Sequence, residues 1–262
     1  MVASARVRTR VTDALGIDVP ILQGGMHHVA TAPLVAAVSA AGALGTLTAL
    51  TQPTPEALRE EIKRVRAMLD GVKTKRTGRA PVFAVNFTLL PALAPPDYEG
   101  YARVIVEEGV RVVETAGANP GKWIAYFKRH GITIVHKCTM LRHAKAAIAL
   151  GADLISVDAF ECAGHPGTND VGAMVLLAKA RDELNVPFVA CGGIGTGRQV
   201  AAALALGADA VCMGTRFMAT REAPIMDGIK NALVAADENQ TTLVMTTVNN
   251  TERVYKNKVA EE

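Results

Sequence analysis

Residues 149–158 read ALGADLISVD, and residues 205–214 read ALGADAVCMG. In each segment a helical pattern ends at a glycine, Gly151 or Gly207, and a short apolar run follows. Glycine at this place favours a left-handed helix C-cap before a strand. The echo therefore predicts that the chain uses one helix-to-strand unit repeatedly.

The same alternation runs through most of the chain. Short apolar, β-branched runs alternate with amphipathic segments of roughly ten to fifteen residues, which is typical of βα units on a parallel sheet. Gly42, Gly109 and Gly131 lie at further helix-to-strand boundaries. Eight units in 262 residues fit a closed (β/α)8 TIM barrel better than an open doubly wound sheet. The eight expected strands begin at Pro20, Leu44, Val82, Arg111, Thr133, Leu154, Phe188 and Ala210.

Composition limits the class of protein. With 50% hydrophobic and 20% charged residues, the chain can bury a large core and is not a disordered or nucleic-acid-coating polypeptide. The formal charge of +3 is spread out, and the basic stretch KTKRTGR at 73–79 indicates a solvated loop, with an anion or nucleic-acid patch as the alternative. No stretch is typical of a membrane span or a signal peptide, so we expect a cytoplasmic protein.

The cysteines give no metal or disulfide motif. The four lie far apart in the sequence and form no C-x-x-C pair, which favours reduced thiols and no metal site. They are Cys138, Cys162, Cys191 and Cys212.

Polar residues follow the expected strands where a TIM barrel places its active site, at the strand C-termini. The first strand is followed by Gly24, Gly25 and Met26. We interpret them as a loop that lets a ligand approach the backbone, with a tight turn as the alternative. Asn86 lies near the end of the third strand. We interpret Lys137 on the fifth strand as a contact to a polar ligand, with an ion pair to Asp158 on the sixth strand as the alternative.

Two glycine-rich loops predict a phosphate site. CGGIGTG, from Cys191, and MGTRF, from Met213, follow the seventh and eighth strands, and each leads into a helix. Backbone N–H groups and helix N-termini at these two places are the usual phosphate site of the fold. Tight turns are the alternative.

His165 is the candidate catalytic residue. It ends the stretch ISVDAFECAGH and precedes Pro166-Gly167, on a loop with little to pack against. Imidazole suits proton transfer at neutral pH, so we predict a general base or acid, with a neutral hydrogen-bond donor or a structural role as alternatives. Structural or solvated roles are favoured for the other histidines considered, His27, His28, His136 and His143.

From about residue 6 to 258, the chain closely resembles the nitronate monooxygenase family, formerly 2-nitropropane dioxygenases, and its bacterial branch that includes NADH:quinone reductases. The motifs that carry the resemblance are PILQGGM, VNFTLLP, VVETAG, HKC, VDAFECAGHPG, GGIGTGR and ALGADAVCMGTRF. Their combination and order are specific, although each alone is weak.

The resemblance implies a single FMN-binding barrel domain over residues 1–262 and assigns roles to individual residues. His165 matches the family's active-site histidine. The residues that would line the flavin are Gly25, Met26, Asn86, Lys137, Asp158, Ala163 and Gly164. Those that would hold its phosphate are Gly192, Gly193, Gly214 and Thr215.

The resemblance also orders the functions. The first is oxidation of alkyl nitronates with O2 to carbonyl compounds and nitrite, in which His165 would remove the α-proton of a neutral nitroalkane. The alternative is an NADH:quinone reductase. Further alternatives are a flavin-dependent enoyl reductase and a barrel that binds FMN or another phosphate without turnover. All imply small-molecule partners, with no nucleic acid or membrane; the oligomeric state stays open.

Family members continue into a small helical segment that covers the flavin. The polar tail from about residue 238 fits no ninth unit, so we interpret it as the start of this appendage. NNTERVYKNKVAEE, at 249–262, is expected to begin a helix, with the rest of the appendage beyond Glu262.

Overall fold

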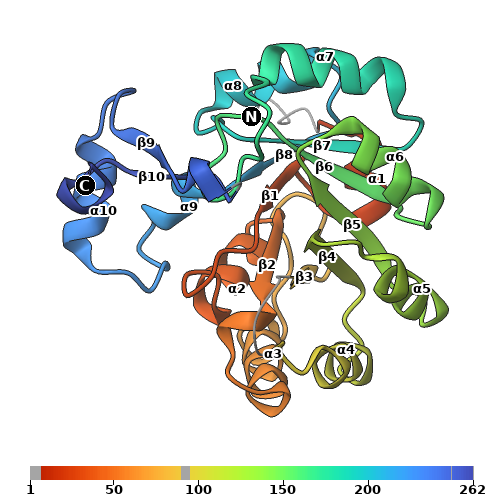
Figure 1. Cartoon of the computed structure of the whole chain (residues 1–262). Helices are drawn as coiled ribbons and strands as arrows, with labels where there is room; N and C mark the ends of the chain where they lie inside the picture. The colour runs from red at the N-terminus through yellow and green to blue at the C-terminus, as the bar shows by residue number, and fades with distance from the viewer. Residues whose placement is uncertain (1–6, 90–94, 249, 262) are drawn as a thin grey trace, which may run out of the picture.

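The eight expected strands form a closed parallel barrel in the computed structural model, which describes residues 7–89, 95–248 and 250–261 (Figure 1). Neighbours pair in sequence order, and β1 closes the ring because Leu22 lies opposite both Leu44 of β2 and Cys212 of β8. The (β/α)8 prediction is thus confirmed. The strands are β1 (Ile21–Gln23), β2 (Leu44–Thr48), β3 (Phe83–Leu89), β4 (Val112–Gly117), β5 (Thr133–Cys138), β6 (Leu154–Asp158), β7 (Phe188–Cys191) and β8 (Ala210–Met213).

Helices alternate with these strands and surround the barrel (Figure 1). In α3, Thr54 caps the first turn, and the buried side chains of Leu58, Ile62 and Val65 recur at helical spacing on the face that meets the core. The helices are α1 (Arg10–Leu15), α2 (Ala32–Ala40), α3 (Pro55–Leu69), α4 (Tyr98–Glu107), α5 (Gly121–Arg129), α6 (Leu141–Ala149), α7 (Ala173–Glu183), α8 (Gly197–Ala205), α9 (Thr215–Met218) and α10 (Asp227–Ala235).

The glycines at the helix-to-strand boundaries have the expected conformation. Their φ angles are positive, as a left-handed C-cap requires. The glycines and angles are Gly42 (90°), Gly109 (57°), Gly131 (71°), Gly151 (104°) and Gly207 (99°).

One end of the barrel is plugged. Val11 and Leu15 of α1 belong to the same buried cluster as the side chains inside the barrel, including Leu22 and Leu44. Arg10 holds this helix by donating hydrogen bonds of 2.8 and 2.7 Å to the carboxylate of Asp209, which precedes β8. Because α1 closes the end where strands begin, the opposite end is left for a site.

The C-terminal segment differs from the prediction. Antiparallel strands β9 (Thr241–Val244) and β10 (Glu252–Tyr255) form a hairpin beside the barrel, and helix α11 covers only Lys258–Glu261 (Figure 1). The expectation that residues 249–262 begin a helix was therefore wrong for Glu252–Tyr255. Val254 and Tyr255 favour a strand, and the main chain of Arg253 pairs with Gly164, outside the local sequence.

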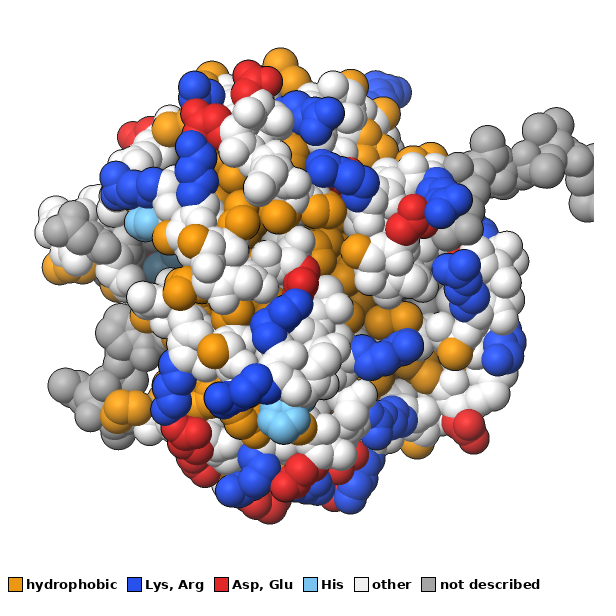
Figure 2. Space-filling model, turned by 90° about the vertical axis from the view of Figure 1, so that its right-hand side faces the viewer, with side chains coloured by type: hydrophobic (Ala, Val, Ile, Leu, Met, Phe, Trp, Pro, Cys, Tyr) orange, Lys and Arg blue, Asp and Glu red, His pale blue; other side chains and the backbone are white. Residues whose placement is uncertain are grey.

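The charges are dispersed on the face shown in Figure 2, where basic side chains are interspersed with acidic ones. Among the helices of the described residues, none is long and apolar enough to cross a membrane.

Candidate active site

A buried group of polar side chains occupies the C-terminal end of the barrel. It centres on Glu114 of β4, whose side chain is 3% exposed. Its Oε1 accepts hydrogen bonds from Asn86 Nδ2 of β3 (2.8 Å) and from the backbone N–H of Gly25 (3.3 Å). Its Oε2 lies 3.5 Å from Nζ of Lys137 on β5. The structure thus brings together Gly25, Asn86 and Lys137, three of the residues predicted from sequence.

Glu114 was missed in the sequence analysis. The signal was present, because a carboxylate inside the apolar run RVVETA (111–116) requires a partner once buried. The sequence left Asp158 as the alternative, as an ion-pair partner of Lys137, but among the described residues Lys137 forms its ion pair with Glu114. Burial alone would lower the pKa of Lys137, but the negative charges around it, that of Glu114 first and that of Asp158 to a smaller extent, hold this pKa well above its ordinary value. Lys137 therefore stays charged.

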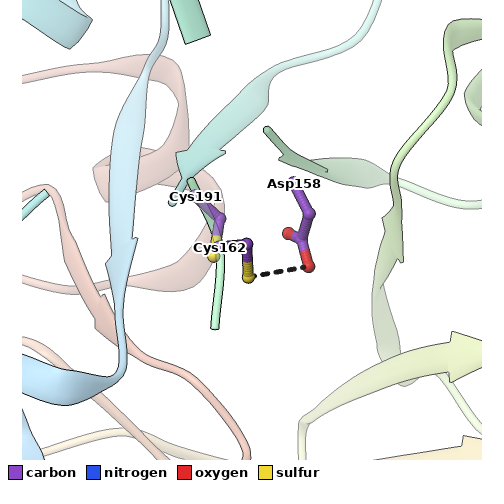
Figure 3. Close-up of side chains that lie close together, drawn as sticks. All are labelled: Asp158, Cys162 and Cys191. Carbon is purple, nitrogen blue, oxygen red and sulfur yellow. Dashed lines mark hydrogen bonds between the residues drawn. The ribbon is translucent and has the colours of Figure 1, made fainter. Parts of the chain in front are cut away.

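Asp158 lies in a second group, with the buried thiol of Cys191 and the half-buried thiol of Cys162. Ligand atoms of Asp158, Cys162 and Cys191 all lie within 4.8 Å of one another (Figure 3). Contact with Cys162, followed by burial, raises the pKa of Cys191 well above its ordinary range, so this thiol is neutral at physiological pH. A soft metal ion such as Zn²⁺ would have to displace the thiol protons to bind here. Sequence spacing gave no hint of this group, because Cys191 of β7 lies far along the chain from Asp158 and Cys162.

Burial raises the pKa of Asp158 itself, although the nearby Lys137 ammonium acts in the opposite direction. Ser156 donates a hydrogen bond of 3.3 Å to Oδ1 of Asp158. The Asp158 carboxyl is therefore easier to protonate than an exposed aspartate, and it faces thiols rather than solvent.

The glycines of the first loop have a packing role. A Cβ on Gly25 would lie 2.5 Å from Cβ of Asn86, and one on Gly24 would lie 2.8 Å from Sγ of Cys212. The tight approach of this loop to the barrel interior thus accounts for both glycines without a ligand. The next residue, Met26, donates its backbone N–H to Oγ1 of Thr48 at 2.8 Å.

Gly214, after β8, is different. Its φ of −112° is open to other residues, and a Cβ there would meet only Sδ of Met26, at 3.6 Å. Neither backbone strain nor packing explains a glycine at this place. Among the described residues, its N–H has no hydrogen-bond partner, nor has that of Gly193 after β7. The loop at Gly193 is fixed because Gln199 donates a 2.6 Å hydrogen bond to its carbonyl.

The loop after β6 carries Ala163, Gly164 and His165. Gly164 has φ of 75°, and the side chain of His165 is 52% exposed. Nε2 of His165 lies 2.9 Å from Oε1 of Glu252 in the C-terminal hairpin, a neighbour that sequence could not indicate. Leu90 and Pro91, which end the motif VNFTLLP, lie outside the described residues.

The other histidines have surroundings that fit the roles favoured for them. His136 is 4% exposed, and its Nδ1 lies 3.0 Å from Oγ1 of Thr115, while His27, His28 and His143 are exposed. His136 thus has a structural partner within the barrel wall.

Known proteins are similar to this chain in sequence and in fold. A family model described as nitronate monooxygenase matches residues 8–262. A Rhodococcus jostii protein named "(3aS,4S,5R,7aS)-5-hydroxy-7a-methyl-1-oxo-octahydro-1H-indene-4-carboxyl-CoA dehydrogenase" is 34% identical over 90% of this chain, which spans 62% of that relative. A nitronate monooxygenase of Paraburkholderia phytofirmans is 33% identical, covering 87% of this chain and 71% of that protein. The structure of FabK from Thermotoga maritima has a TM-score of 0.86 at 34% identity, covering 97% of this chain and 76% of that one.

Proposed function

Because the chain belongs to the nitronate monooxygenase family, we propose that it is an FMN-dependent oxidoreductase in which His165 removes a proton from an acidic C–H group of the substrate. The main support for a bound cofactor comes from the surroundings of Gly214. Its N–H lacks a partner among the described residues, and neither packing nor φ requires a glycine there. Close approach of a phosphate oxygen to the backbone explains both features.

The residues present fit FMN. The N–H groups of Gly193 and Gly214 would hold the phosphate, and Met26, beside Gly214, would contact the cofactor between phosphate and barrel mouth. Lys137 and Asn86, both held by Glu114, would face the polar edge of the flavin and offer it hydrogen-bond donors. When bound, FMN supplies an acceptor for the substrate's electron pair.

His165 would perform the proton chemistry. A neutral nitroalkane has an acidic α-C–H group. Transfer of its proton to an imidazole nitrogen converts the nitroalkane into a nitronate anion. The 52% exposure of the His165 side chain supports this role, because a substrate from solvent can reach the imidazole. A nitroalkane or nitronate is therefore the first candidate substrate.

An acyl-CoA thioester is the second candidate. It is favoured by the name of the Rhodococcus jostii relative, which describes a dehydrogenase of a carboxyl-CoA compound. The hydrogen α to a thioester carbonyl is also acidic, so the same imidazole would take it by the same chemistry. The two candidates share the base and the cofactor, and they differ in the group that holds the substrate.

Anaerobic reduction of the flavin tests this proposal. Protein reconstituted with FMN is mixed separately with nitroethane, its nitronate, an acyl-CoA and NADH, and the flavin absorbance is followed. We expect bleaching by a nitro compound or by the thioester. His165→Asn should slow a substrate that must lose an α-proton by about 10²–10⁴-fold, whereas His143→Asn, a matched change of an exposed histidine, should not. Bleaching by NADH alone would refute the carbon-acid reaction in favour of a quinone reductase.

A further inference from the structure

The C-terminal hairpin pairs with the histidine loop through the backbone. Gly164 and Arg253 form an antiparallel bridge, in which the N–H of Arg253 donates to the Gly164 carbonyl at 2.7 Å and the reverse bond is 3.1 Å. In an antiparallel pair, the residue after one partner lies opposite the residue before the other. This register sets Glu252 opposite His165.

Arg253 fixes that register a second time. Its guanidinium donates hydrogen bonds of 3.3 and 3.1 Å to the carbonyl of Phe160 and lies 4.7 Å from the centre of the Phe160 ring. Phe160 lies near the start of the loop, and Gly164 lies near its middle. Both points of the loop are thus held by one residue of β10, next to Glu252.

The contact between Glu252 and His165 indicates which ring nitrogen of His165 carries a hydrogen. Oε1 of Glu252 lies 2.9 Å from Nε2 of His165, and a carboxylate can only accept. Two lone pairs facing each other at this distance would repel, so Nε2 carries a hydrogen in both the neutral and the cationic ring. Nδ1 is then the nitrogen that can gain and lose a proton.

From this geometry we infer that Glu252 is a positioning residue for His165, which fixes the ring with Nε2–H toward the hairpin and leaves Nδ1 as the atom that takes the substrate proton. This inference rests on the proposed role of His165. When Nδ1 takes a proton, the ring becomes an imidazolium beside the Glu252 carboxylate, which stabilises the new charge. The α-carbon keeps the electron pair of the broken C–H bond.

The test combines a structural and a kinetic measurement on the FMN-loaded protein. Histidine labelled with ¹⁵N reports the ring N–H protons by NMR, and His165→Asn assigns the signal. We expect a protected N–H proton on Nε2 of His165 that is lost in Glu252→Ala. Turnover of nitroethane should fall by about 10-fold or more, within the contribution of a positioned base, while turnover of its nitronate changes by less than about 2-fold. Glu252→Asp should recover part of the loss.

Glu238→Gln is the matched control, because it removes an exposed carboxylate from the same C-terminal segment. It should change neither measurement. A proton on Nδ1 in the unmodified protein would refute the inference, as would equal losses of nitroethane and nitronate turnover in Glu252→Ala, which would show a purely structural role. If the unmodified protein turns over neither substrate, the proposed substrate is wrong, and the NMR measurement still decides whether Glu252 fixes the ring.

Discussion

Replacing Gly214 by valine separates cofactor binding from folding. A Cβ at this place has only Sδ of Met26 within 4 Å, at 3.6 Å, which is an ordinary contact. The φ of −112° does not demand glycine. We therefore expect the free energy of unfolding of the FMN-free protein to change by no more than about 1 kcal/mol.

FMN affinity should respond much more strongly. The valine side chain would obstruct the N–H of Gly214, just before α9, which we assign to the phosphate. A hydrogen bond to a charged group contributes about 1.5–3 kcal/mol, so losing one raises the Kd for FMN by roughly 10- to 150-fold. Gly214→Ala, with a smaller side chain, should have an intermediate effect.

Fluorescence titration with FMN measures the Kd, and urea unfolding without FMN measures stability. Gly228→Val is the control, because a Cβ on this exposed glycine of α10 would meet nothing within 4 Å. A Gly214→Val protein that unfolds like the parent and binds FMN with the parent's Kd would show that the phosphate lies elsewhere.

Three further changes test the barrel itself. Urea unfolding measures the free energy of unfolding, at one fixed pH for the first two changes and over a range of pH for the third. Gly25→Ala should lower the free energy of unfolding by about 1–3 kcal/mol, because its Cβ would overlap Asn86; an unchanged value would contradict the packing described for this loop. Glu114→Gln should lower the free energy of unfolding by about 3 kcal/mol, because it leaves the Lys137 ammonium unpaired. Adding Lys137→Met to this variant should recover part of the loss, and additive losses from the two changes would argue against the pair. Burial lowers the pKa of His136 to about 4, so stability should decline as pH falls from about 6.5 to 4, by at most about 3 kcal/mol, and His136→Asn should abolish this dependence.

Local chemistry was sufficient to predict the barrel. Glycines such as Gly151 and Gly207 end helices by a rule that involves only neighbouring residues, and their φ angles are positive as that rule requires. Repeated alternation of strands and helices indicates parallel strands, and parallel strands in a barrel place their C-termini at one end. That geometry was enough to expect Asn86 and Lys137 near each other.

The partners within the site were less predictable. Lys137 could have paired with Asp158 or Glu114, since both side chains arrive at the same barrel end and the registers on the two sides of β5 place each of them two positions away; the ion pair is with Glu114. Cys162 and Cys191 likewise meet because a loop returns over the end of β7, which spacing along the chain does not encode. Glu252 is the extreme case, because its approach to His165 depends on a hairpin formed far along the chain.

The proposed binding of FMN and the proposed proton transfer thus depend on different parts of the chain, which are held in place in different ways. The residues proposed to hold FMN sit on strands or directly after them, where the closed barrel fixes their positions. His165 is on a loop whose glycines, Gly164 and Gly167, both adopt positive φ and add conformational freedom that ordering must overcome. Arg253 contributes to the order of this loop by binding it at Phe160 and Gly164, in addition to the hydrogen bonds within the loop. Changes in the hairpin should therefore alter proton transfer while leaving FMN affinity intact, whereas changes at Gly214 should do the reverse.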